Sequence, residues 1–71
     1  MSLTKKEEKA LKKFGAQIRA IRQEKGWTLE DAEEQGWPSW QHLQKIEAGQ
    51  KNVTYLTILR LQDLFGVNLI D

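Results

Sequence analysis

Residues that start helices and residues that end them alternate along this chain, at spacings that leave room only for short helices. Ser and Thr cap helix N-termini, and Gly most often follows a helix C-terminus. The cap candidates are Thr4, Thr28, Ser39 and Thr54, and the matching glycines are Gly26, Gly36, Gly49 and Gly66. We expect helices over 5–25, between Thr28 and Gly36, over 39–48 and over 55–65, with at most one further turn after Asn68.

Hydrophobic periodicity supports helices throughout. The segment 5–25 has apolar residues three or four positions apart, on one helical face: Leu11, Phe14, Ile18 and Ile21. No useful length of the chain alternates apolar and polar residues in the manner of a half-buried strand. We therefore expect one all-α domain over residues 1–71, an orthogonal bundle of four to five short helices with residues 1–4 disordered.

Two local motifs define the second helix and the turn that follows it. Asp31 stands three residues after Thr28, which approximates a capping box, and Trp27 before the cap is placed to pack on Ala32 as a hydrophobic staple. Pro38 cannot extend a preceding helix but fits directly before a new one. The turn 36–39 therefore separates two short helices.

The composition excludes several classes of protein. The 71 residues contain no Cys and one His, His42, which excludes disulfides, thiolate zinc sites and two-histidine metal sites. No nucleophile is paired with a base, so we expect neither an enzyme nor a bound cofactor or metal. No apolar run approaches the ~20 residues that span a bilayer, and no secretion leader is recognisable. A cytoplasmic domain that works by binding is the class that remains.

Charge is distributed unevenly although the net charge is +1. Residues 1–25 carry +5, residues 26–47 carry −4 and residues 48–71 are neutral. The basic part includes five closely spaced lysines, which are Lys5, Lys6, Lys9, Lys12 and Lys13. A lysine-rich helix face is most often solvated surface, and contact with DNA phosphates is its functional alternative.

The two short helices joined by a Gly-containing turn have the layout of a helix-turn-helix. In the second, Leu43 and Ile46 are three residues apart and point inward, while Trp40, Gln41, Gln44 and Lys45 occupy the opposite side. Gln suits bidentate contact with adenine, Lys suits guanine or phosphate, and an aromatic ring can cover a thymine methyl. We expect His42 to be a half-buried packing residue behind this face.

Taken in order, several short pieces of the chain resemble the phage-repressor, or Cro/cI-type, helix-turn-helix family. The pieces are Ile18-Arg19, the run 21–28 (IRQEKGWT), the run 43–49 (LQKIEAG), the run 57–61 (TILRL) and Phe65-Gly66-Val67. The resemblance implies a lambda-repressor-like fold and sequence-specific binding of double-stranded DNA by a bacterial or phage transcriptional regulator, located at the nucleoid. Its recognition helix would span about 39–48 and lie in the major groove.

The same resemblance assigns roles to individual residues. Base-facing positions are occupied by Trp40, Gln41, Gln44 and Lys45, and phosphate-facing positions by Thr28, Gln50, Lys51, Asn52 and Thr54. Arg22 and Glu47 fall on positions that commonly form a structural ion pair. It would tie the end of the first helix to the end of the third.

The chain departs from the family pattern around the turn. Leu29 stands where Gln often holds a phosphate, Glu33 where a small Ala is usual, and Trp37 where Gly is usual. Gly36 and Ala32 lie one residue earlier, which indicates a re-registered turn. Late in the fourth helix, Gln62 occupies a position usually filled by Ala.

The fourth helix is more apolar than one core face requires. The resemblance implies a core face of Tyr55, Ile58, Leu61, Gln62 and Phe65, and the additional apolar residues are Leu56, Leu59, Leu64, Leu69 and Ile70. Either a short last helix covers these residues, or they form a two-fold homodimer contact, which we favour. The acidic second helix and Leu29 leave an alternative open: a protein-interaction module, such as an antitoxin or anti-repressor-like partner, with weak DNA binding.

Overall fold

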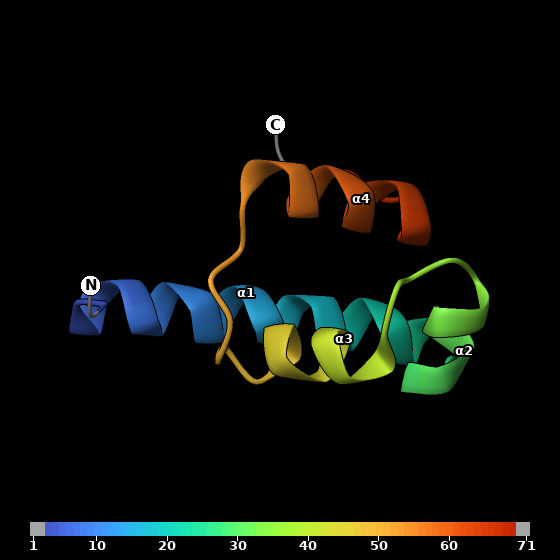
Figure 1. Cartoon of the computed structure of the whole chain (residues 1–71), viewed down its shortest axis with the longest axis horizontal. Coiled ribbons are helices and arrows are strands. Elements are labelled where there is room, and N and C mark those ends of the chain that lie inside the picture. Colours follow the sequence, from blue (N-terminus) through green and yellow to red (C-terminus); the bar gives the residue numbers. More distant parts are fainter. Residues whose placement is uncertain (1–2, 70–71) are drawn as a thin grey trace.

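The computed structural model describes residues 3–69, and within them the chain forms four helices and no strand (Figure 1). They are α1 (Lys5–Glu24), α2 (Leu29–Glu34), α3 (Trp40–Glu47) and α4 (Tyr55–Phe65). The predicted all-α fold is confirmed, and the predicted boundaries are correct to within about one residue. Residues 66–69 are not helical. The turn expected after Asn68 falls mostly on residues 70–71, Ile70 included, which lie outside the described residues.

The expected capping residues start all four helices. The hydroxyl of Thr28 accepts a hydrogen bond from the Asp31 backbone N–H at 3.0 Å, and the Asp31 carboxylate accepts one from the Thr28 backbone N–H at 2.8 Å. Thr4 forms an equivalent capping box with Glu7. Residues 1–4 were expected to be disordered, but Thr4 is the ordered N-cap of α1. Residues 1–2 lie outside the described residues.

Helix α1 packs against α3, α2 also packs against α3, and α4 lies above them in the view of Figure 1. The approach of α1 to α3 depends on Gly15, which is buried. A Cβ at Gly15 would overlap the carbonyl oxygens of Ile46 and Glu47. The last turn of α3 thus lies directly on the backbone of α1, which fixes the direction of the helix expected to contact DNA.

The core is formed by one group of buried side chains from all four helices and the α2–α3 turn: Ile18, Ala32, Trp37, Leu43, Ile46, Leu61 and Phe65. Trp27 packs its ring against Phe65, with 5.7 Å between the ring centroids. The inward direction predicted for Leu43 and Ile46 agrees with their burial.

The prediction that Tyr55 belongs to the core face of α4 is wrong. Tyr55 is 67% exposed and its neighbour Leu56 is 55% exposed. Tyr55 is the first residue of α4 and lies about two turns before the deeply buried Leu61. Leu64 and Leu69, assigned to the additional apolar surface, instead pack partly against the core. The exposed apolar surface of α4 is therefore confined to its first turn.

Candidate nucleic-acid interface

Helix α3 presents a polar face to solvent. Gln41, Gln44 and Lys45 are exposed, whereas Leu43 and Ile46 are fully buried on the opposite side. Trp40, the fourth residue of the predicted base-facing set, is half-buried. The structure therefore brings the three flexible polar side chains onto one open surface and holds the indole at its edge.

The N-terminus of α3 is fixed by two hydrogen-bond acceptors. Ser39 accepts from the His42 backbone N–H at 3.3 Å, and its own hydroxyl donates to the amide oxygen of Gln41 at 2.9 Å. The carboxylate of Glu33 in α2 accepts from the Trp40 backbone N–H at 2.8 Å. Glu33 was not among the predicted site residues. It stands where the motif usually has a small residue, and its hydrogen bond connects α2 directly to α3.

The α2–α3 turn is anchored by Trp37, the departure from the family's usual Gly. Its side chain is only 5% exposed, and its ring lies 5.8 Å from the ring of His42 between centroids. Burial of His42, reinforced by the positive charges of Lys51 and Lys45, lowers the pKa of the imidazole. His42 is therefore a half-buried packing residue behind the polar face of α3, and its surroundings favour the neutral imidazole.

Arg22 and Glu47 meet in a bidentate ion pair at the junction of α1 and α3. The guanidinium donates to the two carboxylate oxygens at 2.8 and 2.9 Å, and also to the Trp27 backbone carbonyl at 2.8 Å. Both side chains are largely buried. The hydrogen bonds to Glu47 raise the pKa of Arg22, partly offset by burial. This one guanidinium connects the end of α1, the end of α3 and the segment that leads into α2.

The same pair decides the charge of the α3 surface. Glu47 is the single acidic residue of α3, and its carboxylate is turned inward to Arg22 rather than toward solvent. The exposed face of α3 therefore carries Lys45 and neutral amides, without an acidic group to repel phosphates.

The loop that follows α3 exposes the residues expected to contact phosphates. Gln50, Lys51 and Asn52 are exposed, and the Gln50 backbone N–H donates to the Lys45 carbonyl at 2.9 Å, which fixes the start of the loop. Thr54 caps α4: its hydroxyl accepts from the Thr57 backbone N–H at 3.2 Å. This loop therefore lies directly beside the C-terminal end of the polar face.

Thr28 was expected to contact a phosphate, but its polar groups already form hydrogen bonds within the protein. Both its hydroxyl and its backbone N–H are bound to Asp31 in the capping box. An incoming phosphate would meet the Asp31 carboxylate at the same place. The geometry thus gives Thr28 a capping role in the free protein.

A hollow of about 290 Å³ lies between α1, α2 and α3, beside the polar face. It is lined by Arg19, Arg22, Leu29, Gln44, Glu47 and Ala48. Arg19 is exposed and shares this hollow with Gln44, although the sequence analysis assigned Arg19 no role in binding. The sequence feature that could have indicated a role for Arg19 is its position three residues before Arg22, which places both on the same face of α1.

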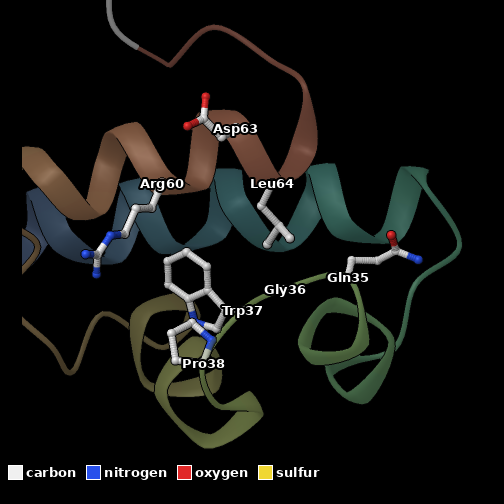
Figure 2. A pocket seen from close by; sticks show the side chains of 7 residues that line it. All are labelled: Gln35, Gly36, Trp37, Pro38, Arg60, Asp63 and Leu64. Carbon is white, nitrogen blue, oxygen red and sulfur yellow. The ribbon is translucent and has the colours of Figure 1, made fainter.

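A larger, open hollow of about 530 Å³ lies between the α2–α3 turn and α4 (Figure 2). The lining residues are Gln35, Gly36, Trp37, Pro38, Arg60, Asp63 and Leu64. None of the predicted DNA-contacting residues lines it, and in Figure 2 the Asp63 side chain points away from Trp37. It is a separate feature of the surface.

Two kinds of feature are absent from residues 3–69. No helix in this range is long and apolar enough to cross a membrane. No group of three or more His, Cys, Asp or Glu side chains in the range is placed to hold a metal ion.

Comparisons with known proteins agree with this geometry. A family model for helix-turn-helix proteins, HTH_3, matches residues 18–71. The chain is also 33% identical over 60 residues to an uncharacterized HTH-type transcriptional regulator, y4dJ, of Sinorhizobium fredii, a match that covers 84% of this chain and 78% of that protein. No solved structure matches significantly.

Proposed function

This chain belongs to the Cro/cI-type helix-turn-helix family of DNA-binding transcriptional regulators, and on that premise we propose that it is a sequence-specific repressor that places α3 in the major groove of double-stranded DNA. The observation that carries the proposal is the α3 surface itself. It exposes Gln41, Gln44 and Lys45, and it has its one acidic residue, Glu47, turned inward. A major groove admits one α-helix and presents donors and acceptors that amides and ammonium groups recognise.

Within the proposed complex, Gln41 and Gln44 read base edges, with adenine as the preferred bidentate partner of an amide. Gln41 must first release its oxygen from the Ser39 hydroxyl, which holds it at 2.9 Å in the free protein. Lys45 contacts either guanine or a phosphate, and Trp40 packs against a thymine methyl at the edge of the contact.

The proposed phosphate contacts flank this reading face. Lys51, Gln50 and Asn52 lie on the exposed loop after α3, and Thr54 caps the helix that follows. Such contacts set the register and orientation of the protein on the duplex and carry no sequence information. Thr28 completes the set only if the phosphate displaces Asp31 or is held by the surrounding backbone amides.

We also propose that the regulator works as a homodimer through the first turn of α4. Among the described residues, three large apolar side chains are exposed, and two of them, Tyr55 and Leu56, lie in this turn; the third is Leu3. A two-fold contact would present two copies of α3 to successive half-sites, which predicts a palindromic operator. The site of action would be the nucleoid of a bacterial or phage-infected cell.

The test is selection of bound sequences from a random pool of DNA duplexes with the full chain. Enrichment of a palindrome whose half-sites are centred about one helical turn apart supports the proposal. A pool that remains random after repeated selection contradicts it.

A protein-interaction module, such as an antitoxin-like partner, is the second candidate. The specific observation in its favour is the acidic surface of α2, where Glu30, Glu33 and Glu34 are exposed next to α3. Acidic groups at this position repel the phosphates that α2 would cross. A random pool after selection, together with tight binding of a basic protein partner that Glu30→Gln weakens, would favour this candidate.

A further inference from the structure

The N-terminal half of α1 is a lysine-rich extension of the helix-turn-helix. The family match begins at residue 18, whereas α1 begins at Lys5. In Figure 1 these first turns of α1 project beyond the end of α3. All lysines of this stretch are exposed: Lys5, Lys6, Lys9, Lys12 and Lys13. The extension therefore adds positive charge at a place that the matched family model does not cover.

Close packing fixes this extension against the loop proposed to bind phosphates. Gly49, which follows the C-cap residue of α3, has a φ of +72°, and a Cβ there would lie 2.7 Å from the Cα of Lys12. Gly15 lies three residues after Lys12 in α1, and a Cβ there would overlap the carbonyl oxygen of Ile46. Because two glycines permit this contact, α1 and the start of the 50–52 loop are held at a fixed distance from one another.

Helical spacing divides the lysines into two faces. Lys5, Lys9 and Lys12 follow steps of four and three residues, so they share the face that meets Gly49. Lys6 and Lys13 are each one residue further along, about 100° around the helix. Lys5 lies seven residues before Lys12. At 1.5 Å per residue, the shared face therefore extends roughly 10 Å along α1 from Lys12, beside the loop, to Lys5.

The lysines of this face are available to an external anion. The ion pair found within residues 3–69 joins Arg22 to Glu47 and involves none of them. Of the two acidic residues in this stretch, Glu7 turns back to accept the Thr4 backbone N–H at 2.9 Å, and Glu8 is exposed near the lysine face. Three ammonium groups against one carboxylate leave the face positive.

We propose that Lys5 and Lys9 bind DNA backbone phosphates outside the major-groove contact of α3, so that α1 continues the phosphate contacts of the 50–52 loop. This inference rests on the proposed DNA-binding function and extends it. Lysines bind phosphates as mobile point charges, independent of base sequence. The contact would strengthen binding to any duplex long enough to reach the extension.

The test compares two double variants that remove the same charge from different faces of α1. Lys5→Gln/Lys9→Gln removes the proposed contacts, and Lys6→Gln/Lys13→Gln is the matched control. Each is titrated with a mixed-sequence duplex of about 30 bp at several salt concentrations, after circular dichroism has verified wild-type helicity. The first variant should lower the slope of log K against log salt by about 1.8, since each lost phosphate contact is worth about 0.9. The control should leave the slope close to that of wild type.

Equal slope changes in the two variants would contradict the inference, because they would reflect the overall field rather than contacts. Unchanged slopes in both would also contradict it and would assign the lysines to solvent or to an acidic protein partner. In either outcome the proposed function stands, since the wild-type chain still binds the duplex. Failure of the wild-type chain to bind any duplex at low salt would instead overturn the proposed function itself.

Discussion

The carboxylate of Glu33, near the end of α2, accepts a hydrogen bond from the backbone N–H of Trp40, the first residue of α3, at 2.8 Å. The first N–H groups of a helix have no partner within the helix and require an acceptor from elsewhere. Ser39 supplies one from the local sequence and Glu33 supplies a second from the preceding helix. The negative charge also lies at the positive end of the α3 dipole. Glu33 thus fixes the angle between the two helices of the motif.

Glu33→Ala should lower the free energy of unfolding by about 1 kcal/mol, the usual cost of a lost N-cap. Glu34→Ala is the control, because Glu34 is exposed on the same helix whereas the acceptors at the start of α3 are Ser39 and Glu33. Urea denaturation of both variants measures the difference. Equal stability of the two variants would show that the Glu33 contact contributes nothing in solution.

Glu47→Ala should be more damaging than Glu33→Ala. It removes two charge-assisted hydrogen bonds and leaves the largely buried Arg22 guanidinium with the Trp27 carbonyl as its remaining acceptor. We expect a loss of about 1.5–3 kcal/mol, the range for hydrogen bonds to charged groups and above the effect of a surface change. Thermal unfolding at neutral pH measures it. A melting temperature as close to wild type as that of Glu34→Ala would mean that the pair is solvated and contributes little.

Much of this architecture follows from the sequence because its signals are local. Each helix start depends on a side chain three residues from the backbone group that it caps, as with Thr28 and Asp31. Contacts between helices cannot be derived from such local signals: the Arg22–Glu47 pair was implied by the family resemblance alone, and the Glu33 contact was missed. Glu33 was recognised only as a departure from the family, and its contact with Trp40 depends on how α2 and α3 are oriented.

The limit of periodicity is visible at Tyr55. A spacing of three and four residues defines a face but not where along the helix the core ends. Tyr55, grouped with Leu61 and Phe65 on the predicted core face, lies in the first turn of α4 and is therefore exposed. The polar face of α3 was easier to predict, because the helix is short and its two inward residues are unambiguous.

Leu56→Lys should shift the oligomeric state toward monomer. Leu56 is exposed and adjoins Tyr55 in the proposed two-fold contact, so a lysine there would bring two like charges together across the axis. Analytical ultracentrifugation over a range of concentrations measures the shift, with unchanged helicity as a condition. Gln17→Lys adds the same charge at an exposed position of α1 and should leave association unchanged. A wild-type chain that remains monomeric at all concentrations would rule out the dimer.

Acidification should destabilise the fold through His42. Its pKa in the folded chain lies below the ordinary value of 6.5, chiefly because burial disfavours the charged imidazole. The unfolded chain therefore binds more protons just below that value, and stability is lost as the pH falls through it. His42 is the single His of the chain, so His42→Gln should flatten the dependence of stability on pH between about 5 and 7.5. Parallel pH profiles for the variant and wild type would contradict this.

The central claim is that α3 reads DNA sequence, and Gln41→Ala tests it most directly when compared with Lys51→Ala. Gln41 lies on the exposed face of α3, whereas Lys51 lies in the loop proposed to hold phosphates. Each variant is titrated with the selected operator and with a scrambled duplex, at several salt concentrations. Gln41→Ala should cost about 1–3 kcal/mol on the operator and little on the scrambled duplex. Lys51→Ala should weaken both alike and lower the salt slope by about one. If Gln41→Ala weakens both duplexes equally, α3 is not the element that reads the bases.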